Sequence, residues 1–213
     1  IHPPKTSRHQ RPPLPRRIIM PAHKLKNHPY FTYEIWEDEL FNAYAALARH
    51  HAKISNPNIS FIVAQQIKSA TFRDLCSGAK NIHDLFDEHK EKQCRSMDFC
   101  WYCGRSTKEC GALETEHILP KSKGGNARNE GNIAYACHDC NTNKGTKDFI
   151  LWYIENFGKL PDIQLFRMYL KNVYFFSFDN ALLTKPCLEL ESMPNLPFSP
   201  QSIKQILEDL KKL

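Results

Sequence analysis

The chain has 213 residues, of which 41% are hydrophobic and 11% aromatic, and its formal net charge is +6 at pH 7. This composition is sufficient to bury a hydrophobic core. No apolar run reaches the length of a membrane-spanning helix and no secretory signal segment is recognisable, which favours a cytoplasmic protein over a membrane or secreted protein.

Residues 1–29 are expected to form a basic, flexible arm. They contain seven lysines and arginines, no aspartate or glutamate, and seven of the 14 prolines, so the rest of the chain is close to neutral. Such a segment cannot form a packed core and would be attracted to a polyanion. We expect Arg16 and Arg17 to bind nucleic acid. A solvated tail or a leftover targeting sequence is the alternative interpretation.

Residues 30–95 are predicted to form a helical module. Apolar residues recur at three- and four-residue spacing over 33–53, which indicates a first helix. Ser60 is a candidate N-cap for a second helix that Gly78 would end. A short third helix is expected at 82–89. The module shows no chemical motif, so a scaffold, a DNA-reading element and a dimerising element all stay open.

Residues 96–157 are predicted to contain, in order, a strand, a loop, a strand and a helix. The strands are expected at 115–119 and 132–136, with turn-forming residues at 121–126 between them. The helix is expected to run from 139 to about 157. The predicted fold class is therefore α+β, with a small strand-containing core.

Residues 158–213 are predicted to form a helical C-terminal extension. Apolar spacing over 163–173 indicates a helix, and an aromatic run at 174–178 follows it. This run is expected to be buried in a core or a dimer contact rather than stacked on bases. Ser199 is a candidate N-cap for a last helix, with Pro200 at its first position.

Four of the eight cysteines form two CxxC pairs, which suits a structural zinc site in a reducing compartment. Two-residue spacing lets both sulfurs of a pair face one ion at tetrahedral angles, and such a site contributes on the order of 10–16 kcal/mol to folding. The predicted zinc ligands are Cys100, Cys103, Cys137 and Cys140. The others, Cys76, Cys94, Cys110 and Cys187, are expected to be buried thiols, with Cys94 and Cys110 as alternative ligands.

Within and just after the segment that the cysteines enclose lie an acid–histidine pair, Glu116-His117, and the amides Asn132 and Asn141. These residue types suit an oxygen-preferring metal ion beside a general base. Together with the cysteine pairs, residues 100–147 resemble an HNH endonuclease of the ββα-metal (His-Me finger) superfamily in its zinc-clamped form.

This resemblance implies a role for each matching position. His117 would be the general base, because a neutral imidazole can take a proton from water at physiological pH. Asn132 would hold the loop and orient His117, with Asn129 as a weaker candidate for that role. Glu116 and Asn141 would bind one catalytic Mg²⁺ or Mn²⁺ ion.

Glu116 departs from the usual family pattern, which has aspartate directly before the catalytic histidine. The extra methylene of Glu116 would move its carboxylate, so that ligation is either direct or through water. Glu114 would face the same side of a strand and is a fallback ligand. His138 lies inside the second cysteine pair and is interpreted as a residue at the tip of that knuckle, near phosphate.

Basic residues of the same segment are expected to contact nucleic acid. Lys144 follows Asn141 by about one helical turn and could bind a backbone phosphate as a point charge. The other expected contacts are Lys121, Lys123 and Arg128.

The leading hypothesis is a divalent-metal-dependent DNA endonuclease of restriction type, as a homodimer whose protomers cut one strand each. Specificity would come from outside the motif, because the motif itself binds backbone and shape. A homing or phage-type nicking endonuclease is the nearest alternative. A non-catalytic zinc module that binds DNA or RNA, and a toxin-like effector nuclease, also stay open. RNA is a further possible substrate, since the site would recognise phosphate.

Overall fold

The computed structural model describes residues 35–82, 97–125 and 130–212. The predicted arm with Arg16 and Arg17, and likewise Cys94, Arg128 and Asn129, lie outside the described residues, as does nearly all of the third helix expected at 82–89. The described elements are α1 (Trp36–Ser55), α2 (Phe61–Ser77), α4 (Thr107–Cys110), β1 (Leu113–His117), the 3-10 turns η1 (Lys121–Lys123) and η2 (Glu130–Asn132), β2 (Ile133–Cys137), α5 (His138–Lys144), α6 (Phe149–Phe157), α7 (Ile163–Asp179), α8 (Cys187–Glu191) and α9 (Pro200–Lys212).

The two N-terminal helices follow the sequence prediction closely. The apolar pattern over 33–53 forms α1, which starts a few residues later than expected. In α2 the Oγ of Ser60 accepts a hydrogen bond from the backbone N–H of Val63 at 3.3 Å, so the predicted cap is confirmed. Gly78 ends the helix in the left-handed conformation, with a φ of 74° that glycine adopts without strain.

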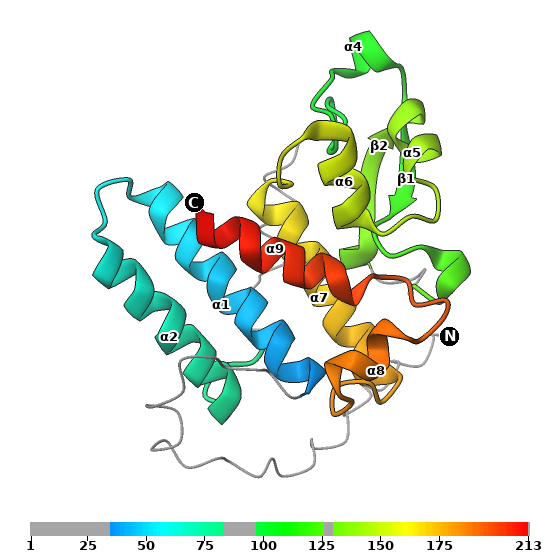
Figure 1. The fold of residues 1–213 in the computed structure, drawn as a ribbon. Coiled ribbons are helices and arrows are strands. Elements are labelled where there is room, and N and C mark those ends of the chain that lie inside the picture. The colour runs from blue at the N-terminus through cyan, green and yellow to red at the C-terminus, as the bar shows by residue number, and fades with distance from the viewer. Residues whose placement is uncertain (1–34, 83–96, 126–129, 213) are drawn as a thin grey trace, which may run out of the picture. The chain divides into compact units, whose positions relative to one another are not determined.

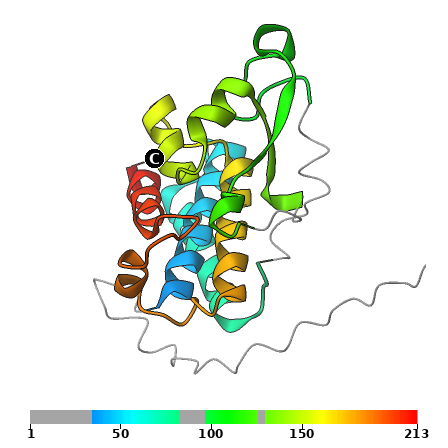
Figure 2. The ribbon, with the colours of Figure 1, turned by 90° about the vertical axis from the view of Figure 1, so that its right-hand side faces the viewer.

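The helical core forms where α1 packs against α7 and α9. Figure 1 shows α1 running between α2 and α9, and Figure 2 shows α7 alongside α1. Trp36 is fully buried, donates from Nε1 to the Oγ of Ser177 at 2.9 Å and stacks on Phe198 with ring centroids 5.5 Å apart. The aromatic run 174–178 forms the last turns of α7 and packs on the core, as expected.

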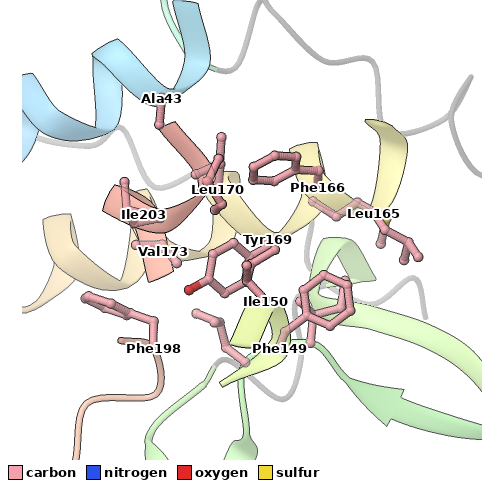
Figure 3. Packing of buried hydrophobic residues seen from close by; sticks show 14 of the residues in the cluster. Ala43, Phe149, Ile150, Leu165, Phe166, Tyr169, Leu170, Val173, Phe198 and Ile203 are labelled. Carbon is pink, nitrogen blue, oxygen red and sulfur yellow. The ribbon is translucent and has the colours of Figure 1, made fainter. Parts of the chain in front are cut away.

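Helix α6 joins this core to the strand-containing segment. Figure 3 shows Tyr169 of α7 among the side chains of Ile150 and Ile203. The ring of Phe149 lies 5.8 Å from that of Tyr169, centroid to centroid. The Nδ2 of Asn172, also on α7, donates to the backbone carbonyl of Gly131 at 2.8 Å. The described residues therefore share one buried cluster that includes both the helices and the hairpin.

Strands β1 and β2 form an antiparallel hairpin that is paired from Leu113↔Cys137 to His117↔Ile133. Both strands exist as predicted, but β1 begins two residues earlier than the predicted strand and β2 one residue later. The structure is α+β, with a two-stranded sheet among helices. No helix in the described ranges combines the length and the apolar character needed to cross a membrane.

The prediction of one continuous helix over 139–157 is wrong. The chain forms α5, which is capped by Gly145, and then α6. Asp148 starts α6 because its Oδ1 accepts hydrogen bonds from the backbone N–H groups of Ile150 and Leu151, both at 3.0 Å. Glycine followed by a good N-cap residue is a helix break that the apolar spacing alone does not reveal.

Candidate metal centre and catalytic site

The four predicted zinc ligands lie together. The sulfur atoms of Cys100, Cys103, Cys137 and Cys140 are all within 4.8 Å of one another. The Sγ atoms of Cys103 and Cys137 are 3.9 Å apart. Tetrahedral zinc with Zn–S bonds of about 2.3 Å places its sulfurs roughly 3.8 Å apart, so this donor set fits zinc. Cys110 is not part of the cluster, and its thiol donates instead to the carbonyl of Ser106 at 3.1 Å.

The first cysteine pair sits on a tight turn. The N–H of Cys100 donates to the carbonyl of Arg105 at 2.8 Å, and the N–H of Gly104 donates to that of Cys100 at 2.9 Å. Gly104 has a φ of 76°. Hydrogen bonding from Cys140, with smaller contributions from backbone donors and against the effect of burial, lowers the pKa of Cys100 to about 4. A thiolate at this position is the form that binds zinc.

Arg105 contacts two of the four sulfurs and was not anticipated from the sequence. Its guanidinium donates to the Sγ of Cys103 and of Cys137, both at 3.4 Å, and to the Oδ2 of Asp139 at 2.7 Å. The bond to Asp139, followed by those to the thiols, raises the pKa of Arg105. A cation here offsets the negative charge of a tetrathiolate site and orients its ligands. The only indication of this contact in the sequence was the position of Arg105, two residues after Cys103.

His117 is the last residue of β1 and is half-buried. The chain that follows it is held by Asn132, which is fully buried. The Oδ1 of Asn132 accepts from the N–H of Leu119 at 2.8 Å, and its Nδ2 donates to the carbonyl of the same residue at 3.0 Å. The carbonyl of Asn132 also accepts from the N–H of Ile118 at 2.9 Å. This arrangement is the one that a loop-holding role for Asn132 requires.

The glycine pair after the loop is needed for close packing. A Cβ atom at Gly125 would lie 2.2 Å from the carbonyl oxygen of Leu119, a distance that no side chain tolerates. Gly124 has a φ of 88°, and a Cβ there would lie 3.3 Å from the ring of Phe176. Glycine therefore lets the loop fold back against the segment that follows His117.

Glu116 is buried and both of its carboxylate oxygens have partners. Lys144 donates from Nζ to Oε1 at 2.6 Å, and the hydroxyl of Tyr102 donates to Oε2. Lys144 is fully buried and also donates to the backbone carbonyl of His117 at 2.9 Å. The prediction that Lys144 contacts a phosphate is therefore wrong for this arrangement. Its ammonium points into the protein, because α5 packs on the face of β1 that carries Glu116.

Asn141 pairs with the other acid of β1. Its Nδ2 donates to Oε2 of Glu114 at 2.5 Å, and the Nδ1 of His138 lies 2.8 Å from Oε1 of the same carboxylate. These bonds, from Asn141 first and then His138, lower the pKa of Glu114, and Glu114 in turn raises the pKa of His138. Of the two predicted cation ligands, Asn141 is therefore hydrogen-bonded to the fallback ligand Glu114, whereas Glu116 is hydrogen-bonded to Lys144 and Tyr102.

The remaining expected contacts are only partly described. Lys121 and Lys123 lie on η1, directly after the loop that follows His117, with Lys121 exposed and Lys123 half-exposed. Arg128, Arg16 and Arg17 lie outside the described residues. Tyr102 was not predicted to take part in the site, although an aromatic residue between two paired cysteines was a visible signal.

Comparison with known proteins identifies one family. Residues 100–147 match the HNH endonuclease family. No curated protein and no solved structure matches the chain. The match covers the cysteine cluster, the hairpin and α5, and it supports a function as a nuclease or nucleic-acid-binding protein.

Proposed function

We propose that this chain, which carries an HNH endonuclease module at residues 100–147, is a divalent-metal-dependent DNA endonuclease. The observation that carries the proposal is the placement of His117. It ends a strand of a hairpin whose other end meets the four-cysteine cluster, and Asn132 holds the segment that follows it. A rigid backbone on both sides of a half-buried imidazole suits a general base.

In the proposed reaction His117 accepts a proton from a water molecule. The water oxygen attacks phosphorus, the bond from phosphorus to the 3′ oxygen breaks, and the 3′ oxygen takes up a proton from solvent. Asn132 contributes indirectly by fixing the backbone after His117. The phosphodiester is thereby split into a 5′-phosphate and a 3′-hydroxyl.

Glu114 and Asn141 are the residues that we propose to hold the catalytic cation. Carboxylate and amide oxygens are ligands that Mg²⁺ accepts, and these two side chains are in contact between β1 and α5. Glu116 is less suited because Lys144 and Tyr102 already use both of its oxygens. When bound, Mg²⁺ or Mn²⁺ would polarise the phosphate and stabilise charge on the leaving oxygen.

We propose that the DNA backbone lies over η1, where Lys121 and Lys123 can contact phosphates. Arg128 and the basic arm with Arg16 and Arg17 would add further contacts. The finer assignment is a restriction-type enzyme acting as a homodimer, with a homing or nicking enzyme as the alternative.

A non-catalytic zinc module that binds DNA or RNA is the second candidate function. The engagement of both Glu116 oxygens favours it, because the acid that precedes the histidine is then not presented to a cation. In that case binding would survive the loss of His117 and no cleavage would occur.

The test is plasmid cleavage with Mg²⁺, Mn²⁺ or EDTA, comparing wild type, His117→Ala and the control His50→Ala on α1. We expect metal-dependent cleavage that falls about a hundredfold or more in His117→Ala, because the general base is lost, and that stays unchanged in the control. Zinc-loaded wild type that binds DNA without cutting it would support the binding module instead. Equal cleavage by His117→Ala would refute the assignment of the base.

A further inference from the structure

We propose that Tyr102, Glu116 and Lys144, here called the positioning triad, connect the zinc site to the backbone of His117. Through them, zinc loading sets the position of the base. This inference rests on the proposed nuclease function and deepens it. It gives Glu116 and Lys144 a positioning role in place of the cation-binding and phosphate-binding roles that the resemblance implied.

The triad starts inside the first cysteine pair. Tyr102 lies between two predicted zinc ligands and is only 3% exposed. Its ring contacts those of Phe149 and Trp152, with centroids 5.5 and 5.2 Å away. Its backbone carbonyl accepts from the hydroxyl of Tyr153 at 3.1 Å. Since Tyr102 lies between two predicted zinc ligands and its ring is packed, its hydroxyl has one fixed direction, toward Glu116.

The triad ends on the backbone of the base. Glu116 immediately precedes His117 and is 5% exposed. Lys144, 0% exposed, donates both to Oε1 of Glu116 at 2.6 Å and to the carbonyl of His117 at 2.9 Å. Asn132 secures the residues that follow. The backbone of His117 is therefore held on both sides, at the point where the pairing of β1 ends.

A purely structural role does not explain why the triad is ionic. Removing a carboxylate and an ammonium from water costs free energy, and apolar side chains of similar size often stabilise a protein as well or better. What apolar residues cannot do is donate a directed hydrogen bond to the carbonyl of His117. That bond comes from Lys144, whose own position depends on Glu116 and, through it, on Tyr102.

The main experiment compares wild type with the apolar triple variant Tyr102→Phe/Glu116→Leu/Lys144→Met, in which no buried charge is left unpaired. We expect the variant to fold and keep its zinc, while kcat for plasmid cleavage falls about 10- to 100-fold with little change in KM, since the base is misplaced rather than lost. A folded, zinc-loaded triple variant with wild-type kcat would overturn the proposal.

A milder variant keeps the test decisive if the triple variant does not fold. Tyr102→Phe removes one hydroxyl and keeps the packed ring. The readout is the NMR signal of the His117 ring in the two zinc-loaded proteins, assigned with His117→Ala. We expect this signal to differ between zinc-loaded wild type and zinc-loaded Tyr102→Phe, because the hydrogen bond that links the zinc turn to Glu116 is lost. Identical signals in the two zinc-loaded proteins would show that the zinc site does not act on His117 through Tyr102.

Glu116 either positions His117 or binds the catalytic cation, and the Mg²⁺ concentration that gives half-maximal rate distinguishes these two roles. If Glu116 positions His117, Glu116→Gln lowers kcat and leaves the Mg²⁺ concentration for half-maximal rate unchanged. A several-fold increase in that concentration would make Glu116 a cation ligand and overturn the triad. If wild type cuts no plasmid at all, the proposed function fails, and the NMR comparison of the zinc-loaded proteins still decides whether the triad links the zinc site to His117.

Discussion

Asn132 illustrates how a single buried residue can hold a reacting group that it does not touch. Its side chain gives one donor and one acceptor to Leu119, two residues after His117. The sequence suggested this role only through the resemblance, since an asparagine between two strands is otherwise an ordinary turn residue. The structure adds the reason, which is that both polar groups of Leu119 are buried and need partners.

We predict that Asn132→Ala lowers the free energy of unfolding by about 3 kcal/mol, because the N–H and the carbonyl of Leu119 are both left without a partner. Urea denaturation followed by circular dichroism measures this change. The matched control is Asn156→Ala on α6, an exposed residue whose Nδ2 donates to the carbonyl of Trp152 at 2.8 Å, and a change within about 0.5 kcal/mol is expected there. Equal effects of the two substitutions would contradict the role given to Asn132.

The pairing of Glu116 with Lys144 was not predicted from the sequence. The sequence placed a carboxylate before the histidine and a lysine one turn after Asn141, and from the resemblance both were expected to face the substrate. In the structure they face each other. The two residues are 28 positions apart, and the chain between them carries no signal of this pairing, because it arises only when α5 packs on the hairpin.

At the scale of elements, the position of α5 explains the partners of both acids of β1. His138, Asn141 and Lys144 are spaced by three residues and therefore lie along one face of the helix. Glu114 and Glu116 lie on one face of β1 because side chains alternate along a strand. With α5 over this face, the first acid meets His138 and Asn141 and the second meets Lys144. The three-residue spacing on α5 and the two-residue alternation on β1 together determine which residues of α5 each acid contacts.

Helix α6 depends on Asp148 for its start and for its attachment to neighbouring elements. Besides capping α6, the carboxylate accepts from the hydroxyl of Tyr169 at 2.7 Å and from the N–H of Ser199 at 2.9 Å. Burial raises the pKa of Asp148, against the effect of these donors. One side chain therefore ties α6 to α7 and to the chain that enters α9.

We predict that Asp148→Ala lowers the free energy of unfolding by about 4 kcal/mol, because a cap is lost and two further donors lose their acceptor. The control is Asp162→Ala, which removes the matching cap of α7, where Oδ1 accepts from Gln164 and Leu165, and it should cost about 1 kcal/mol. Both values come from urea denaturation. A cost for Asp148→Ala no larger than that of the control would show that the bonds to Tyr169 and Ser199 contribute nothing.

At the scale of the whole molecule, two parts of the described chain are stabilised differently. The helices α1, α7 and α9 bury large apolar side chains such as Trp36, Tyr169 and Ile203. The hairpin has two short strands and carries alanines at Ala134 and Ala136 on the face that it buries. Its stability is therefore expected to come largely from the metal.

We predict that Cys103→Ser, or removal of zinc by a chelator, unfolds the hairpin and α5 while most of the helical signal remains, since the helical core does not need the metal. Zinc analysis, far-ultraviolet circular dichroism and the melting temperature measure the outcome. Cys110→Ser is the control, because Cys110 lies in the same segment but outside the cluster, and it should retain its zinc. A Cys103→Ser protein with full zinc and an unchanged melting temperature would remove Cys103 from the ligand set.

The sequence by itself determined the features that depend on short spacing. Two CxxC pairs predicted the cysteine cluster, Ser60 and Gly78 predicted the limits of α2, and the apolar periods predicted most helices. These features are local, so a few neighbouring residues contain their physical cause. The tertiary structure alone decided which acid is buried, which lysine is removed from solvent and how Tyr102 reaches Glu116. Those outcomes depend on the packing of α5 and α6 against the hairpin, since burial and pairing are set by residues that are distant in the chain.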